Sequence, residues 1–292
     1  MLNIIVAPKS HNSKAEKHIK KIVKHLKAEK EEFSVYFLRS LNDIITTVKE
    51  TTALGENEFV VVGDDIVVHE FINATKDLSK IKLGIVPVSK HDDFASYVGI
   101  SHNPITAIKE IVKRNITQTD LILVNNDIKV INTISIGANV EIWERYSQFK
   151  IKNALSEKIA FAKYADKFVG EHLTFTNKNG KSKSETIYQL IVANGGRSKG
   201  KLVSPLSNIH DGLFNFAYYT LAESHTNKHN LKLFNKSHHI YDESLKQQWL
   251  TDLKISNEEN QIKAMIDGKI VTLDKLNLQL VENALKLYQS EK

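Results

Sequence analysis

The chain has 292 residues, of which 41% are hydrophobic and 25% are charged. These proportions are ordinary for a globular protein, and no apolar run approaches the ~18 residues of a membrane-spanning helix, so we expect no integral membrane protein. The absence of cysteine excludes disulfides and thiolate metal sites and fits a reducing compartment. The length exceeds the usual size of one domain, so we expect two domains, or one domain with a large insertion.

The net charge of +6 favours an anionic partner, namely a lipid surface, a nucleic acid or a phosphorylated ligand, without choosing among them. The first residues carry no basic leader and run directly into a strand-like segment, so we expect no secretory signal and a cytoplasmic protein. Many lysines lie between Lys14 and Lys30, above apolar residues at helical spacing. They form either a solvated helix face or a patch for a membrane surface or polyanion.

The first 125 residues alternate short apolar strands with helices. The predicted strands are 2–6, 34–38, 59–62 and 83–88, and the predicted helices are 41–53 and two that begin at Ser13 and near Val67. Such alternation is typical of a parallel sheet wrapped by helices, with ligand sites at the carboxyl ends of the strands.

After residue 125 the pattern becomes mostly strand-like, with turns between the strands. The predicted strands are 128–136, 173–176, 186–193, 213–220, 262–266 and 276–281. Asn179-Gly180 is typical of a hairpin turn, and residues 151–168 form a helical interruption. We predict an α/β domain over residues 1–125 and a β-rich domain over residues 126–292, whose last strand is able to return to the first domain.

Several short segments follow the predicted strand ends. In the first half they are APKSH (7–11), GDDIV (63–67) and PVSKHDDFA (87–95); in the second half they are ANG (193–195), Gly200, Pro205, DGL (211–213) and IDGK (266–269). Their order and spacing, over nearly the whole chain, resemble the bacterial diacylglycerol kinase and lipid kinase family, which is related to sphingosine and NAD kinases. The resemblance implies an N-terminal α/β domain like that of NAD kinase and diacylglycerol kinase, and a C-terminal β-sandwich domain.

Two of the family's nucleotide motifs are only partly kept. Pro8 and Ser10 remain from the Asn-Pro-x-Ser-Gly turn. The Gly-Gly-Asp-Gly-Thr loop, which receives the phosphates of ATP in the family, keeps Gly63 and Asp65, while Asp64 takes the place of the second glycine. The resemblance implies that these residues lie near a bound nucleotide.

The third nucleotide motif of the family is Pro-x-Gly-Thr-Gly-Asn-Asp-Phe-Ala. Its flanks and its second aspartate, Asp93, match here, but both glycines are gone. Lys90 and His91 replace the threonine and the second glycine. The resemblance implies that Lys90 also lies near the nucleotide.

The second half carries the family's acceptor-side motifs. Asp267 matches the aspartate of Asp-Gly-Glu, which is the base that takes the proton from the lipid hydroxyl in the family, and Lys269 replaces the glutamate. Asp211 matches an aspartate that belongs to a Mg²⁺ site. The resemblance therefore implies ATP- and Mg²⁺-dependent phosphorylation of a lipid hydroxyl, with the lipid drawn from the membrane surface.

The replaced glycines argue against an ordinary phosphate loop. Glycine allows backbone amides to approach a phosphate closely because it has no Cβ and tolerates positive φ, whereas the β-branched Ile66 would be an outlier there. A negative charge on Asp64 about 4 Å from a phosphate would cost on the order of 4 kcal/mol. That free energy corresponds to roughly a thousandfold loss of affinity.

Two arrangements could compensate for the lost glycines. Lys90 and His91 could pair with phosphate, or Asp64 and Asp65, together with Asp92 and Asp93, could hold a hydrated Mg²⁺. Alternatively, Lys90 simply pairs with a nearby aspartate and side chains fill the space. The sequence leaves these alternatives open.

Two turns in the second half also have ordinary structural explanations. Asp267-Gly268 is equally consistent with a type I′ hairpin turn. Asn194-Gly195-Gly196, with Arg197 and Lys199, is either an anion-binding turn or a plain strand-to-loop turn. His69 begins a partial H-E-x-x-H zinc motif, but the second histidine is absent.

Two hypotheses about function remain. The first is a lipid kinase that uses ATP and Mg²⁺ to phosphorylate a membrane lipid at the inner membrane surface. The second is a catalytically inactive family member that binds a lipid, a nucleotide or a partner protein. Phosphorylation of a soluble substrate such as NAD gains no support from the sequence. We expect no nucleic-acid partner, and the oligomeric state stays open, with a homodimer among the alternatives.

Overall fold

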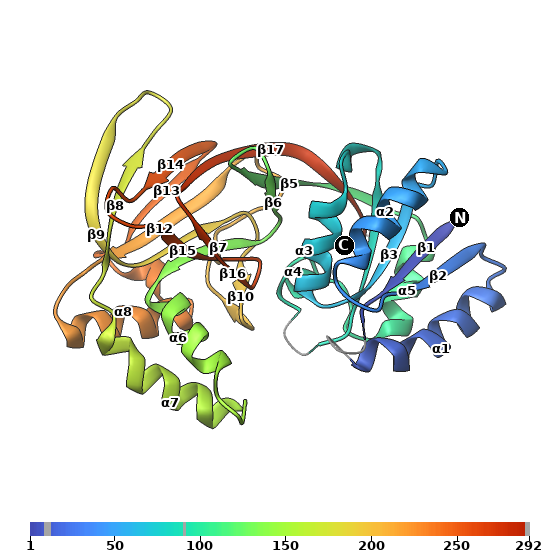
Figure 1. The fold of residues 1–292 in the computed structure, drawn as a ribbon, viewed down its shortest axis with the longest axis horizontal. Helices are drawn as coiled ribbons and strands as arrows, with labels where there is room; N and C mark the ends of the chain where they lie inside the picture. The colour runs from blue at the N-terminus through green and yellow to red at the C-terminus, as the bar shows by residue number, and fades with distance from the viewer. Residues whose placement is uncertain (9–12, 90–91, 290–292) are drawn as a thin grey trace. The chain divides into compact units, whose positions relative to one another are not determined.

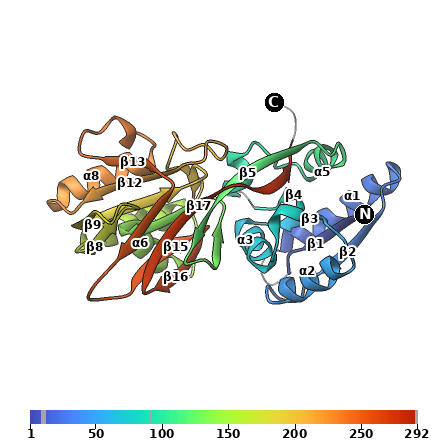
Figure 2. The same cartoon turned by 90° about the horizontal axis from the view of Figure 1, so that it is seen from above.

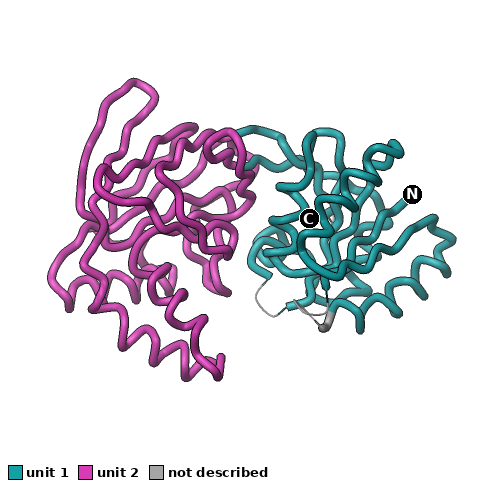
Figure 3. Tube along the Cα trace, viewed as in Figure 1, with its two compact units in different colours: residues 1–121, 281–292 teal, residues 122–280 magenta. Residues whose placement is uncertain are grey.

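The computed structural model describes residues 1–8, 13–89 and 92–289. Its contacts divide the chain into two compact units (Figure 3). Unit 1 contains residues 1–121 and 281–292, and unit 2 contains residues 122–280. The chain therefore passes twice from one unit to the other, within strands β5 (Ile116–Val124) and β17 (Lys275–Tyr288).

Unit 1 is built around a parallel sheet with the strand order β2-β1-β3-β4, and the end of β17 pairs in parallel with β4. The strands are β1 (Leu2–Val6), β2 (Phe33–Phe37), β3 (Glu58–Gly63) and β4 (Lys82–Pro87). In β1, β3 and β4 almost every residue is buried, as is typical of strands covered on both faces.

Helices cover both faces of this sheet (Figures 1 and 2). On one face α1 contacts α5, and on the other α2 contacts α3. The helices are α1 (Ser13–Ala28), α2 (Asp43–Ala53), α3 (Asp65–Ala74), α4 (Asp93–Tyr97) and α5 (Pro104–Val112), with a 3₁₀ turn η1 (Leu78–Lys80). On α1, Ile19, Ile22 and Leu26 are buried beneath the lysines, as in an amphipathic surface helix. Both interpretations of the lysines in the segment 14–30 stay open.

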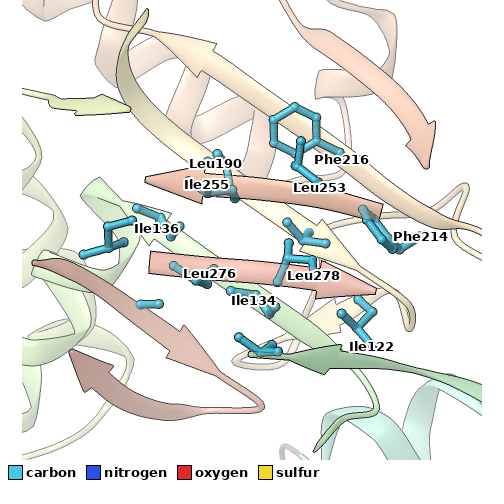
Figure 4. Close-up of a cluster of buried hydrophobic side chains, with 14 of the residues drawn as sticks. Ile122, Ile134, Ile136, Leu190, Phe214, Phe216, Leu253, Ile255, Leu276 and Leu278 are labelled. Atoms are coloured by element: carbon cyan, nitrogen blue, oxygen red, sulfur yellow. The ribbon is translucent and has the colours of Figure 1, made fainter. Parts of the chain in front are cut away.

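Unit 2 is a β-sandwich of antiparallel strands around one apolar core (Figure 4). Residues of β17 alternate strictly here, since Leu276, Leu278 and Leu280 are buried while the residues between them are exposed. Strand β9 pairs with β8 along its first half and with β7 and β12 along its second half, so it joins the two layers.

The strands of unit 2 besides β5 and β17 are β6 (Ile128–Val130), β7 (Thr133–Gly137), β8 (Glu171–Thr176), β9 (Ser182–Ala193), β10 (Arg197–Ser198), β11 (Lys201–Leu202), β12 (Phe214–Thr220), β13 (Lys246–Leu250), β14 (Asp252–Ser256), β15 (Ile262–Ile266) and β16 (Lys269–Leu273). Its helices are α6 (Ala138–Ser147), α7 (Ala154–Tyr164) and α8 (Ser224–Asn235), with 3₁₀ turns η2 (Ala165–Lys167) and η3 (His239–Tyr241).

Three sequence predictions need correction. The strand predicted at 128–136 is interrupted at residues 131–132, where the backbone amides bond to a side chain instead of a neighbouring strand. Helices α6 and α8 lie in the half predicted to be mostly strands. The predicted start of α3 near Val67 is two residues late, because the side chain of Asp64 caps the helix from Asp65.

No helix within the described ranges is long and apolar enough to cross a membrane.

Gly63, at the end of β3, is expected to be intolerant of any side chain. A Cβ built there would lie 2.7 Å from the Cβ of Val67, on the first turn of α3. We predict that Gly63→Ala lowers the free energy of unfolding by about 1–3 kcal/mol, because α3 must move away from the sheet. The midpoint of thermal unfolding should fall accordingly.

A double-mutant cycle with Val67→Gly, which removes the clashing Cβ of residue 67, tests the cause. If the clash is with Val67, the double variant should be clearly more stable than the sum of the two single changes in unfolding free energy predicts. Additive effects in the melting curves would contradict this explanation.

Candidate functional site

The carboxyl edge of the parallel sheet in unit 1 is the first candidate site. Strands β1, β3 and β4 end side by side here, with Gly63 paired to Pro87 in the register of β3 and β4. The strand order reverses direction at β1, whose neighbours are β2 and β3, and such a switch point is where open α/β sheets bind ligands. Pro8, after β1, is buried at this edge, whereas Ser10 and Lys90 lie outside the described residues.

The start of α3 is capped by the chain's own carboxylate. Asp64 is the N-cap residue, and its Oδ1 accepts a hydrogen bond of 3.3 Å from the backbone N–H of Val67. Helix N-termini attract phosphate because their free N–H groups and the helix dipole favour negative charge. At α3 this favourable position is taken by Asp64, and Ile66 lies in the first helical turn.

Gly63 is retained for packing. Its φ is not positive, in contrast to several other glycines of the chain, and the space beside its Cα is filled by Val67. Close contact between strand and helix therefore explains the glycine without any phosphate.

Asp65 links the two loops of this edge. Its carboxylate accepts hydrogen bonds from the backbone N–H of Asp93 at 2.6 Å and of Phe94 at 3.1 Å, at the start of α4. Burial, together with the nearby charge of Asp93, raises the pKa of Asp65 well above its usual range, and the two amide bonds oppose this rise. The side chain is thus a structural bridge between the segment after β3 and the segment after β4.

Asp92 is a second buried carboxyl at the same edge. It accepts a hydrogen bond of 2.8 Å from the backbone N–H of Ser89, and only 1% of its surface is exposed. Burial raises the pKa of Asp92 to about 6, and the charge of Asp64 contributes in the same direction. Its Oδ1 has no hydrogen-bond partner within the described residues, as befits a carboxyl that is protonated over part of the ordinary pH range.

These residues fit nucleotide phosphates and Mg²⁺ poorly. Asp64 and Asp92 accept bonds from backbone N–H groups of their own loops, and Asp65 accepts them from the loop after β4. Each of these carboxyls adds negative charge or resists ionisation. No group of three or more histidine, aspartate or glutamate side chains in the described ranges is arranged to hold a metal ion. The described residues therefore give no support to the alternative in which Asp64, Asp65, Asp92 and Asp93 together hold a hydrated Mg²⁺.

The second candidate site lies in unit 2, at the turn between β15 and β16. Ile266 pairs with Lys269, so Asp267 and Gly268 form a two-residue hairpin loop, with φ values of 45° and 88°. Positive φ at both positions is what a type I′ turn requires. One of the two sequence interpretations, the hairpin turn, thus describes the local structure.

The carboxylate of Asp267 is held by three backbone amides. It accepts hydrogen bonds of 3.1, 3.0 and 3.1 Å from the N–H groups of Ile131, Asn132 and Thr133, and its own N–H donates to the carbonyl of Thr133 at 2.9 Å. Only 4% of the residue is exposed. This carboxylate therefore fixes the connection between β6 and β7, and a role as general base would have to use an oxygen that already accepts these bonds.

A polar network surrounds this connection. The side chain of Asn132 donates to the carbonyl of Arg197 at 2.8 Å, and that of Asn194 donates to the carbonyl of Ile131 at 2.9 Å. A Cβ on Gly195 would lie 2.3 Å from Oδ1 of Asn132, so only glycine fits there. The family-like Asn-Gly and Asp-Gly segments thus meet around one loop in unit 2.

Lys199 adds a positive charge to this turn. It lies in the loop between β10 and β11, and its Nζ donates to the carbonyl of Gly268 at 3.1 Å. The same ammonium lies 5.3 Å from the centre of the Trp143 ring, a cation–π geometry. The sequence offered Lys199 as part of an anion-binding turn, but its contact with Gly268 could not be predicted because the two residues are far apart in the chain.

Asp211, predicted to belong to a Mg²⁺ site, is exposed. Its Oδ1 accepts a hydrogen bond of 3.0 Å from the backbone N–H of Leu213, which is the geometry of an Asx turn. It belongs to no group of acidic side chains that could hold a metal within the residues described.

Sequence analysis also missed a polar cavity of about 460 Å³ in unit 2. Glu171 and His172 from β8 line it together with Glu141, Asn257 and Lys263. Burial raises the pKa of Glu171 to about 6. No sequence signal could have found this cavity, because its residues come from separate strands and loops.

Comparisons with known proteins show which family and which structures this chain resembles. Residues 1–124 match the family model of the diacylglycerol kinase catalytic domain. A stretch of 77 residues is 36% identical to the Bacillus subtilis (strain 168) protein named "Putative lipid kinase YtlR", and covers 26% of this chain and 23% of that protein. Residues 1–124 form a domain of the diacylglycerol kinase and lipid kinase family.

Solved structures extend the likeness of fold to the whole chain. A diacylglycerol kinase from Bacillus anthracis str. Sterne has a TM-score of 0.73 at 18% identity, over 99% of this chain and 96% of that one. An NAD kinase from Archaeoglobus fulgidus, solved in complex with ATP, has a TM-score of 0.55 at 14% identity, over 100% of this chain and 95% of that one. The predicted fold class, a diacylglycerol kinase-like α/β domain followed by a β-sandwich domain, is confirmed.

Within this lipid kinase fold, we predict that Asp92→Asn stabilises the protein at neutral and alkaline pH. Because the folded-state pKa of Asp92, about 6, lies above its ordinary value of 3.8, ionisation destabilises the fold as the pH rises through this interval. The variant should gain on the order of 1–3 kcal/mol over the wild type at pH 8 and almost nothing at pH 4, measured by denaturant unfolding.

Asp77→Asn is the matched control. Hydrogen bonds from Ser79 and Lys80 lower the pKa of this exposed carboxyl, so its ionised form is the stabilised one. The control should show no gain at pH 8. Equal gains in both variants would contradict the role assigned to burial at Asp92.

Asp267→Ala should destabilise the β-sandwich by about 2–5 kcal/mol, because three buried N–H groups would lose their acceptor. Thermal unfolding monitored by the fluorescence of Trp143 and Trp249 would measure the loss, with the exposed Asp274→Ala as the control. If Asp267→Ala melts like the wild type, the carboxylate is not a structural element of this turn.

Proposed function

We propose that this member of the lipid kinase family binds a membrane lipid without transferring phosphate from ATP. The observation that carries the proposal is the carboxylate of Asp64 at the N-terminus of α3. It bonds to the N–H of Val67 at the position where an anion would bind, and it repels a phosphate.

The rest of the carboxyl edge supports the same conclusion. Asp65 and Asp92 are buried carboxyls whose raised pKa values show that negative charge is already unfavourable there. A triphosphate would add several more negative charges. Without the family's glycines, backbone amides have no close approach by which to compensate them.

A membrane lipid is the ligand class that the comparisons favour. Relatives are named as lipid and diacylglycerol kinases, and the net charge of +6 suits a surface of anionic lipids. Binding of a lipid does not require the nucleotide loops, so it is compatible with the carboxyl groups found at this edge.

The second candidate is an active lipid kinase, which would use ATP and Mg²⁺. What favours it is Asp65, which still ties the loop after β3 to α4 and so keeps the frame of the nucleotide edge. In that case the residues near the nucleotide and metal would be those that match the family motifs, namely Pro8, Ser10, Gly63, Asp64, Lys90 and Asp211. Asp267 would be the base that takes the proton from the lipid hydroxyl.

Replacing Asp64 distinguishes the two candidates. We expect wild-type protein to show no Mg²⁺-dependent binding of ATP in calorimetric titration, and Asp64→Gly to bind ATP measurably, because removal of the carboxylate frees the N–H of Val67 and relieves up to about 4 kcal/mol of repulsion. Asp64→Asn, which removes the charge but keeps a capping oxygen, should show a smaller gain.

Labelled ATP with Mg²⁺ and a mixed lipid extract supplies the direct activity test. The proposal requires that wild-type protein yields no labelled lipid. Labelled lipid that disappears in Asp267→Asn, at unchanged folding, would overturn it in favour of the kinase.

A further inference from the structure

Helix α7 carries apolar side chains on two opposite faces. One face packs into unit 2, where Ala160 is fully buried and Phe161 and Tyr164 join an apolar cluster with residues of α6 and β9. The other face exposes Leu155 and Ile159, one helical turn apart, with 67% and 49% of their surface accessible. A surface helix normally presents polar residues on its outer face, so the outer face of α7 needs an explanation.

The exposed apolar surface continues on both sides of the helix. Ile151, just before the cap residue Asn153, is 70% exposed, and Val169, just after η2, is 80% exposed. Figure 1 shows α7 on the outside of unit 2, with α6 beside it. We call the residues Ile151, Leu155 and Ile159, with the lysines Lys152, Lys158 and Lys163, the α7 face.

The charges around this surface are strongly one-sided. The segment 150–167 contains exposed lysines at positions 150, 152, 158, 163 and 167. Its acidic residues are neutralised by cations from elsewhere in unit 2: Glu157 pairs with Lys201 at 2.9 Å, and Asp166 pairs with Lys228. The α7 face is therefore both apolar and positively charged.

This combination fits a bilayer of anionic phospholipids better than a protein partner. Interfacial helices bury an apolar face at the boundary between headgroups and acyl chains, while lysines reach the lipid phosphates with their long stems. Protein interfaces, by contrast, are depleted of lysine. Lys158 lies within one helical turn of both Leu155 and Ile159, and Lys163 lies about one turn after Ile159, so charges flank the apolar residues at short range.

We infer that the α7 face docks unit 2 onto the surface of an anionic lipid bilayer. The inference rests on the proposed function for its purpose, since a protein that binds a membrane lipid must reach the bilayer. It does not require ATP or phosphate transfer. Docking inserts Leu155 and Ile159 into the headgroup region and holds the lysines at the phosphates.

Co-sedimentation with vesicles tests the inference, with no nucleotide present. Wild-type protein should bind vesicles of equal parts phosphatidylglycerol and phosphatidylcholine at least tenfold more tightly than vesicles of phosphatidylcholine alone, and binding should weaken as salt is raised. The apolar variant Leu155→Ser/Ile159→Ser and the charge variant Lys158→Glu/Lys163→Glu should each bind the anionic vesicles at least tenfold more weakly.

Two controls change similar residues elsewhere. Leu54→Ser replaces an 81% exposed leucine of unit 1, and Lys232→Glu reverses an exposed charge on α8. Both should bind like the wild type. Melting curves of all variants should match that of the wild type, since the replaced side chains are exposed.

Three results would overturn the inference: no binding of wild-type protein to anionic vesicles, unchanged binding by both α7 variants, or an equal loss in the controls. A concentration-dependent dimer that disappears in Leu155→Ser/Ile159→Ser would assign the surface to a second copy of the chain instead. Docking and the proposed function fail separately, because vesicle binding is measured without ATP, and labelled lipid is measured independently of it.

Discussion

The hydrogen bonds that the carboxylate of Asp65 accepts from the first N–H groups of α4 are the constraint on which the carboxyl edge of unit 1 depends. They join the segment that leaves β3 to the segment that leaves β4, and so fix where α3 and α4 begin. A buried carboxylate can join two segments in this way only if the hydrogen bonds that it accepts from backbone amides offset its loss of hydration. Asp65 therefore has a structural role at this edge that requires no ligand.

Each family-like residue at this edge has a structural partner of its own. Gly63 lies against the side chain of Val67, Asp64 caps α3, and Asp65 accepts bonds at the start of α4. Asp267 behaves in the same way in unit 2, where its carboxylate organises the connection between β6 and β7.

Much of the fold could be predicted from the sequence because local patterns are strong there. The apolar runs of β1, β3 and β4, the hairpin at Asn179-Gly180 and the family-like segments each give an unambiguous signal over a few residues. Helices α6 and α8 were missed because few apolar residues mark their inner faces; in α8 the buried apolar residues are Leu231 and Phe234. The sequence placed the boundary at residue 125, and the contacts divide the chain after Leu121.

The candidate sites were harder to predict, because they depend on bonds between distant residues. No motif predicts the bond from the N–H of Asp93 to Asp65, or the encounter of Asp267 with three amides more than 130 positions earlier. Glu171 belongs to no motif at all. What decides their roles is burial and the direction of backbone amides, which only the folded chain defines.

The return of β17 to unit 1 limits how the domain can be separated from the rest of the chain. Residues 1–124 match the family's catalytic domain, yet the parallel neighbour of β4 comes from residues 286–287, and Leu285, Leu287 and Tyr288 are buried there. A polypeptide that ends at residue 124 would leave an unpaired, apolar strand edge, which is a template for aggregation. The domain that the sequence family recognises is thus not a unit that can be cut out by a single cleavage.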